Sequence, residues 1–486
     1  MTFDIRQKTE EPQQTGTLKR IVTLDILRGI AIFGMILVHI SYKLYDSSYL
    51  FERIANGEGF PFYVWILIVI LGYFGTWHGF FLFISAIVNT YSFSKKARKQ
   101  KDLGKLLLKN TIAGTLVIVI GYLVEGLGYF GYFGTALREG QWNTFRAFSG
   151  ENFWIQTLQI IGFALIINGV VQYLLFRKGG VEKDRRNIII YAVLTIFVLT
   201  ITPLINFGIA NLGFWQEVPG RNWPDIFFVD KNRTAAAWFL TLLAGPKAPI
   251  FPYLASAFLG GIIGIFLSNP KPKMRWLTWF SLGGIGFIIL GGILIVLSFT
   301  TNFRVDPRIP FAETTLPFSI IEEPPAIPTY MIRLGGQICL IMLLLRVIEF
   351  RGKGEKMANR PVMKYFRRWS YLSLTLYSLQ ILEILPRAFL KACFYDTGIT
   401  EIDFMHHYTV SNIGYLILII VFILVFYEAI IFIFYQIKFI GTLEWFFVTI
   451  QNLASKIKSA KINHSLLNNQ VEWVNLTPEP PFKGLS

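Results

Sequence analysis

The chain has 486 residues, of which 53% are hydrophobic and only 16% are charged, and its formal net charge is +16. A soluble domain of this length cannot bury so much apolar surface, which excludes a soluble globular class. Lys and Arg gather in alternate loops between apolar stretches, as the positive-inside rule describes for membrane proteins. The positive charge therefore indicates membrane topology, and we expect no nucleic acid among the partners.

Apolar stretches of about 20 residues, the length of a helix that crosses the hydrocarbon core, recur along the chain. With the basic loops inside, both termini are predicted to be cytoplasmic. A shorter apolar stretch over 62–72 predicts an extra helix that leads into the second span and breaks near Gly72 and Gly75. The sequence thus predicts an all-α, polytopic integral membrane protein with about ten or eleven transmembrane helices. The spans are expected near 21–43, 72–93, 106–126, 152–176, 187–209, 247–267, 276–300, 329–349, 369–391 and 411–437.

Three segments are expected along the chain. Residues 1–20 are polar and form a cytoplasmic tail, and residues 21–440 form one membrane domain without an internal repeat. Residues 441–486 begin with a stretch that contains Trp445 and Phe446, with lysines further along, a pattern typical of a helix that lies in the membrane interface. The rest of this segment forms a cytoplasmic tail.

The first span, LDILRGIAIFGMILVHIS, carries Asp25, Arg28 and His39. Ionisable side chains are costly inside a bilayer, so each is a functional hypothesis by default. Arg28 and His39 are eleven positions apart, which places them on nearly the same helix face and about 16 Å apart along the axis. With the amino terminus inside, Arg28 lies near the cytoplasmic third, where it could bind an anion. His39 lies in the outer half, where it could accept a proton.

Each of these residues also has a purely structural interpretation. Asp25 and Arg28 can neutralise each other at the i,i+3 spacing, which is compatible with a site. His39 can be a hydrogen-bonded packing residue between helices. Its alignment with Arg28 favours the functional interpretation.

Other predicted spans carry polar side chains that are expected to face the bundle interior or a wet cavity. Hydrogen bonds between helices are the structural alternative for the uncharged ones. These candidates are His78, Ser85 and Asn89 in the second span, Glu125 in the third, and Tyr377 and Gln380 in the ninth.

The stretch TLDILRGIAIFGMILVHI resembles the first helix of the transmembrane acyltransferase superfamily. The spacing Arg28-x10-His39 matches the Arg-x10-His motif of its O-acyltransferase branch. Two further stretches, WHGFFLFISAIVNTYSFSKKARK and FPYLASAFLGGIIGIFLS, resemble the second and middle helices of the YeiB-like and heparan-α-glucosaminide N-acetyltransferase-like branches. LSLTLYSLQ and GTLEWFF resemble the YeiB-like carboxy-terminal region.

This resemblance implies an integral membrane enzyme that moves an acyl group, usually acetyl, from cytosolic acetyl-CoA to an acceptor across the membrane. The acceptor is a hydroxyl or amine of a glycan or glycolipid. Arg28 is expected to pair with the donor's phosphates or to orient its thioester. His39 is expected to act as general base. The residues assigned to substrate or cofactor binding are Asp25, Arg28, Ser85, Asn89, Glu125, Tyr377 and Gln380.

The chain departs from the heparan-acetyltransferase-like members at one point. Those members place a catalytic histidine in the loop after the first helix, whereas residues 40–77 contain no histidine here. Either His39 or His78 therefore takes that role, or the chain does something else. No metal is expected, and the expected partners are acyl-CoA, the acceptor, the lipid bilayer of the cell membrane and, as an option, a second copy of the chain.

Two other functions fit the same features. In a transporter or permease, His39, Glu125 and Glu428 would relay protons or line a substrate pathway, although no inverted repeat is recognisable. In a non-catalytic scaffold, the outer loops would bind partners. An enzyme predicts a cytosol-facing cavity that runs from Arg28 to His39, whereas a transporter predicts a central site between symmetry-related halves.

Overall fold

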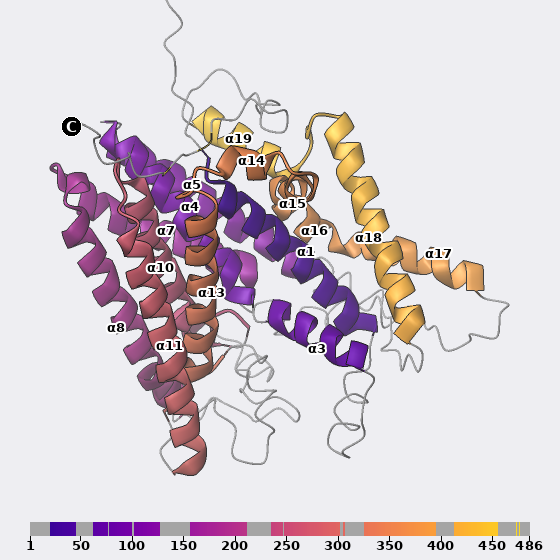
Figure 1. Cartoon of the computed structure of the whole chain (residues 1–486), viewed down its shortest axis with the longest axis horizontal. Coiled ribbons are helices and arrows are strands. Elements are labelled where there is room, and N and C mark those ends of the chain that lie inside the picture. The colour runs from indigo at the N-terminus through magenta and orange to yellow at the C-terminus, as the bar shows by residue number, and fades with distance from the viewer. Residues whose placement is uncertain are drawn as a thin grey trace, which may run out of the picture.

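Helices form nearly all the regular structure of the computed structural model (Figure 1). Within the part of the chain that is described, the only extended pairing is an isolated β-bridge between Arg20 and Trp473. Eight of the described helices are long and apolar enough to cross a membrane, which confirms an all-α, multi-pass membrane protein. The structure describes residues 20–44, 62–75, 77–99, 102–126, 156–210, 235–245, 247–301, 305–306, 325–394, 413–454, 473 and 476.

The eight candidate spans coincide with predicted ones. Each is an apolar stretch long enough to cross the bilayer as a continuous helix. A ninth predicted span corresponds to α4 (His78–Arg98), whose last turns contain Lys95, Lys96 and Arg98 and are therefore polar. The eight are α1 (Val22–Leu44), α5 (Leu103–Gly121) with its π-helical continuation η1 (Tyr122–Gly126), α7 (Thr157–Phe176), α8 (Asp184–Ala210), α10 (Ile250–Ser268), α11 (Arg275–Thr300), α13 (Ile327–Val347) and α18 (Ile413–Gln436).

The prediction of a continuous span over 369–391 is wrong. The chain there forms four short elements, and Pro386 lies in the first turn of the last one. Proline lacks the N–H group and clashes with the carbonyl four residues earlier, so an α-helix cannot run straight through this segment. The elements are α15 (Pro361–Tyr371), α16 (Ser373–Ser378), the 3₁₀-helix η7 (Leu379–Glu383) and α17 (Ile384–Phe394).

Smaller differences concern the short helices. The predicted extra helix is present as α3 (Phe62–Gly75), and the next helix begins at His78 rather than near residue 72. The predicted helix after residue 440 is α19 (Leu443–Ala454), while its position in the interface stays a prediction. The short helices that the sequence did not predict are the 3₁₀-helix η4 (Gly180–Glu182), α9 (Ala235–Ala244) and α14 (Gly354–Ala358).

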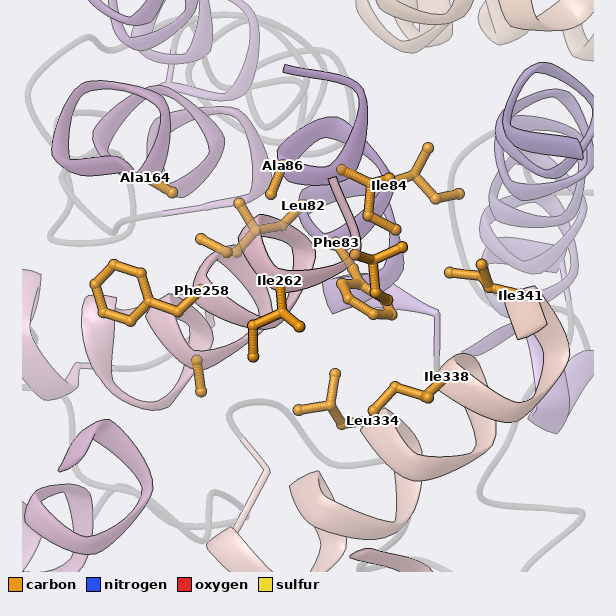
Figure 2. Close-up of a cluster of buried hydrophobic side chains, with 14 of the residues drawn as sticks. Leu82, Phe83, Ile84, Ala86, Ala164, Phe258, Ile262, Leu334, Ile338 and Ile341 are labelled. Carbon is orange, nitrogen blue, oxygen red and sulfur yellow. The ribbon is translucent and has the colours of Figure 1, made fainter. Parts of the chain in front are cut away.

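One core cluster of buried apolar residues extends over several helices, among them α4, α10 and α13. Figure 2 shows Leu82, Phe83, Ile84 and Ala86 of α4 beside apolar side chains of the other two helices. Small residues allow this close approach, because a Cβ at Gly260 would lie 2.6 Å from the Cβ of Ala86.

A second core cluster joins α1 to α15, α16 and α18. It contains Ile32, Ile36 and Ile40 of α1, whereas Leu24 and Leu27 belong to the first cluster. α1 therefore runs between the two groups of helices (Figure 1). Different residues of α1 consequently contact different groups of helices.

Close packing of α1 against α15 depends on Gly29. A Cβ at this position would lie 1.8 Å from the carbonyl oxygen of Phe366. We predict that Gly29→Ala lowers the melting temperature of the detergent-purified protein, because the two helices must separate, at a cost of about 1–3 kcal/mol or more. The matched control is Gly283→Ala in α11, where a Cβ meets nothing within 4 Å. Equal melting temperatures for the two variants would contradict this packing.

Candidate active site along the first helix

Arg28 lies at the basic end of the bundle, which we define as the end where α1 begins and α4 ends with Lys95, Lys96 and Arg98. Its Nε donates a hydrogen bond to Ser370 Oγ in α15, at 2.8 Å. The side chain is 27% exposed, and among the described residues its other guanidinium nitrogens make no hydrogen bond. Arg28 therefore keeps N–H donors that an anion can reach.

Asp25 pairs more closely with another arginine than with Arg28. Arg20 donates to Asp25 Oδ1 at 2.8 Å, whereas the nearest guanidinium nitrogen of Arg28 is 3.9 Å from the same oxygen. The predicted Asp25–Arg28 ion pair is thus present but secondary. Two guanidinium groups therefore share the carboxylate of Asp25.

A buried carboxylate holds the first turn of α1. Glu349 follows the last residue of α13 by two positions, and its oxygens accept hydrogen bonds from the backbone N–H of Thr23 at 2.8 Å and from the Thr23 hydroxyl at 2.5 Å. The amino-terminal N–H groups of a helix lack partners inside the helix, and a carboxylate also suits the helix dipole there. This contact fixes the start of α1 against the end of α13.

His39 lies further along α1 and contacts a glutamine of the segment 361–394, which is divided into α15, α16, η7 and α17. Nδ1 of His39 lies 3.0 Å from Oε1 of Gln380, which is buried in η7. This contact holds the imidazole of His39 against η7, and the tautomer decides which of the two groups donates. A neutral imidazole always carries one basic nitrogen, which a general base needs.

Two further predicted residues bind each other beside this contact. The hydroxyl of Tyr377, in α16, donates to Glu125 Oε1, which also accepts the backbone N–H of Leu158 at 3.3 Å. Glu125 is fully buried and Tyr377 is 8% exposed. Since Tyr377 precedes Gln380 by three residues, the structure brings Glu125, Tyr377 and Gln380 together on the segment that contacts His39.

The structure describes the stripe predicted on α4 only in part. The side chain of His78 lies outside the described residues, so its predicted role is not tested. Ser85 and Asn89 are half-buried, and Asn89 Nδ2 is a buried atom without a hydrogen-bond partner in the described part of the chain. No described hydrogen bond links Ser85 or Asn89 to α1.

Some residues at the site were not among the predicted candidates. Ser370 and Arg20 are polar residues of kinds common at span ends, so nothing in their local sequence marked them. Glu444 accepts the backbone N–H groups of Leu374 and Thr375, at 2.7 and 3.2 Å, and so caps α16. Leu374 and Thr375 belong to LSLTLYSLQ, and Glu444 belongs to GTLEWFF. The sequence marks both stretches as motifs but does not predict that they contact each other.

One ionisable residue inside a span was also missed. Arg333 in α13 is 7% exposed. One turn earlier in the same helix, the hydroxyl of Tyr330 lies 2.5 Å from the hydroxyl of Ser256 in α10. The rule that marked Arg28 applies equally to this arginine and could have found it.

An open hollow of about 680 Å³ lies elsewhere at the basic end. Residues 182–186, Ile189, Ile190 and Asn269 line it, and none of them comes from α1. The cavity expected to run from Arg28 to His39 therefore stays a prediction.

Residues 20–137 match the family model of the heparan-alpha-glucosaminide N-acetyltransferase catalytic domain. This segment is about a quarter of the chain and includes α1, α4, α5 and η1. The match supports the resemblance to the heparan-α-glucosaminide N-acetyltransferase-like branch of the transmembrane acyltransferases, which the stretches WHGFFLFISAIVNTYSFSKKARK and FPYLASAFLGGIIGIFLS had indicated. No curated protein matches the chain.

Protonation of Glu349 is predicted to make stability depend on pH. Burial raises the pKa of this carboxyl to about 7 from an ordinary 4.5, although Thr23 hydrogen bonds oppose the shift. Between these values the folded protein holds a proton that the unfolded chain releases, so stability falls as pH rises. Below about 4.5 both states are protonated, and above about 7 both are ionised.

The measurement compares melting temperatures of the wild type and Glu349→Gln from pH 4.5 to 8. The wild type should lose stability relative to the variant up to about pH 7 and then run parallel to it. Glu182→Gln is the control, because that side chain is 67% exposed. Parallel curves for wild type and Glu349→Gln over the whole range would contradict the shifted pKa.

Proposed function

We propose that the protein is a membrane acyltransferase that moves an acetyl group from acetyl-CoA to a hydroxyl or amine of a saccharide or glycolipid. One observation carries this proposal. Arg28 and His39 lie about 16 Å apart along α1, and each is held by a residue of the same neighbouring segment, Ser370 for Arg28 and Gln380 for His39. An anion-binding group and a base thus lie along one line between two packed elements.

Donor binding is assigned to the basic end. The N–H groups of Arg28 that make no hydrogen bond to the described residues suit a phosphate, since a guanidinium binds two phosphate oxygens at once. Arg20 lies closer to Asp25 than Arg28 does, at 2.8 Å against 3.9 Å, so Arg28 makes the weaker of the two ion pairs. The thioester of the donor would then extend along α1 towards His39.

His39 is assigned the role of general base. Its basic nitrogen takes the proton from the acceptor as the acceptor's oxygen or nitrogen attacks the thioester carbonyl. The C–S bond then breaks, and the leaving thiolate takes that proton from the imidazolium and departs as the CoA thiol. The acceptor gains the acetyl group, and His39 returns to its neutral form.

The sidedness of the reaction follows from charge. The basic end carries Lys95, Lys96, Arg98 and Arg20, so the positive-inside rule supports placing it, and both chain termini, in the cytosol. Acetyl-CoA would enter from that side, and the acceptor would approach His39 from the opposite side of the cell membrane.

Purified protein in detergent tests the two roles separately. We predict that wild type binds acetyl-CoA and that Arg28→Ala weakens binding by roughly tenfold or more, the effect of losing a charged hydrogen bond. His39→Ala should bind normally but transfer acetyl groups to a panel of amino sugars and neutral sugars about 10²–10⁴-fold more slowly.

The control for charge is Arg185→Ala, an exposed arginine that lines the hollow on α8. Its affinity for acetyl-CoA should equal that of the wild type, and melting temperatures should show that every variant is folded. A loss of binding in Arg185→Ala but not in Arg28→Ala would move the donor site to that hollow. If wild type binds no acyl-CoA, the acyltransferase proposal fails.

A further inference from the structure

The open hollow of about 680 Å³ lies at the level where two candidate spans end. α8 begins at Asp184 and α10 ends at Ser268, one residue before Asn269, and both Asp184 and Asn269 line the hollow. Trp279, which is 65% exposed, lies in the second turn of α11, the next helix along the chain. Tryptophan is enriched where lipid meets water, so this level corresponds to the membrane surface.

The side of α8 that continues from the hollow faces lipid. α8 lies at the edge of the bundle (Figure 1). Ile189 lines the hollow, and Val193 and Ile196 follow it at helical spacing, each more than half exposed. Because this stretch belongs to a candidate span, acyl chains cover its exposed apolar side chains. The hollow therefore joins a headgroup level to an acyl-chain surface.

Ion pairs fix the acidic residues of the hollow in place. Arg98, at the end of α4, donates to Glu182 Oε2 at 2.7 Å and to Asp184 Oδ1 at 2.5 Å. Asn269 donates to the second carboxylate oxygen of Asp184, at 2.7 Å. The wall of the hollow is thus built by contacts between α4, the start of α8 and the end of α10, rather than by one surface loop.

Two cations of the hollow are left for another partner. Lys183 and Arg185 are exposed, and neither side chain makes an ion pair or hydrogen bond with another residue in the described part of the chain. Arg186, in contrast, donates to the carbonyl of Leu175 at 2.7 Å and to Asn187 at 2.9 Å. An ammonium and a guanidinium that line one hollow suit the oxygens of a phosphate.

We propose that this hollow binds the headgroup of an anionic phospholipid, with Lys183 and Arg185 at the phosphate and the acyl chains along the Ile189 side of α8. Basic residues at the ends of spans are ordinary, but here they line a hollow with a fixed wall. Basic pockets between transmembrane helices bind anionic headgroups in this way. Because no lining residue belongs to α1, the site is independent of the proposed acyltransferase reaction.

Native mass spectrometry of the detergent-purified protein measures lipid affinity directly. The probes are phosphatidylglycerol and phosphatidylcholine with the same acyl chains, added separately at equal concentrations. The wild type should bind phosphatidylglycerol more tightly. The double variant Lys183→Gln with Arg185→Gln should weaken this binding by roughly thirtyfold, the effect of two basic residues at a membrane surface, and leave phosphatidylcholine binding unchanged.

Two further variants separate the hollow from basic residues in general. The matched control is Arg351→Gln with Lys353→Gln, an exposed pair of the same spacing that follows α13 and does not line the hollow. Its affinity for phosphatidylglycerol should equal that of the wild type. Glu182→Gln removes a negative charge from the hollow and should tighten binding. Melting temperatures check that every variant is folded.

Two competitors distinguish a lipid from other phosphate compounds. Inorganic phosphate and acetyl-CoA carry phosphate but no long acyl chain, so neither should displace phosphatidylglycerol. Displacement by inorganic phosphate would show that the hollow recognises phosphate alone. Displacement by acetyl-CoA would assign the hollow to the acyl donor, and either result would overturn the lipid assignment.

The variants supply the remaining outcomes. Loss of binding confined to the Lys183 and Arg185 double variant, with tighter binding in Glu182→Gln, would support the headgroup site. Equal affinity of the wild type for the two lipids, or an equal loss of phosphatidylglycerol binding in both double variants, would overturn it.

Discussion

A charged and a titratable side chain on one membrane-spanning helix need polar partners at two depths, and this requirement shapes the structure around α1. Ser370 and Gln380 supply these partners. They are ten residues apart on a segment that alternates between helix types instead of crossing the membrane as one helix. One neighbouring segment thus contacts Arg28 near one end of α1 and His39 towards the other.

The four elements of this segment are held in place by the carboxyls of Glu444, Glu125 and Glu383, of which the last two are buried. Glu444 caps α16, and its partner Thr375 in turn accepts the backbone N–H of Leu443, so α19 and α16 cap each other. Burial raises the pKa of Glu444, although the hydrogen bonds it accepts oppose the shift. Further along, Glu125 and Glu383 tether the next turn through tyrosines. Side chains far from α1 in sequence thus determine what His39 contacts.

Hydropathy and helical spacing predicted much of this arrangement, because a span and a polar stripe are local patterns. Arg28, His39, Glu125, Tyr377 and Gln380 were all found in this way, and the structure joins the last four through two hydrogen bonds, one between His39 and Gln380 and one between Tyr377 and Glu125. The division of the segment 361–394 into four elements was not predicted, because the mean hydropathy of a twenty-residue window does not register a helix cap or a single proline. The pairing of polar residues depends on contacts between segments far apart in the sequence, and a local pattern does not contain this information. Arg28, for example, binds Ser370 rather than mainly Asp25.

The most direct test of the account is a cryo-EM structure of the protein with acetyl-CoA. The account predicts phosphates of the donor at the guanidinium of Arg28 and the thioester beside the imidazole of His39, with the arm of the donor running along α1. Donor density in the hollow on α8, or anywhere that leaves α1 uncontacted, would contradict it.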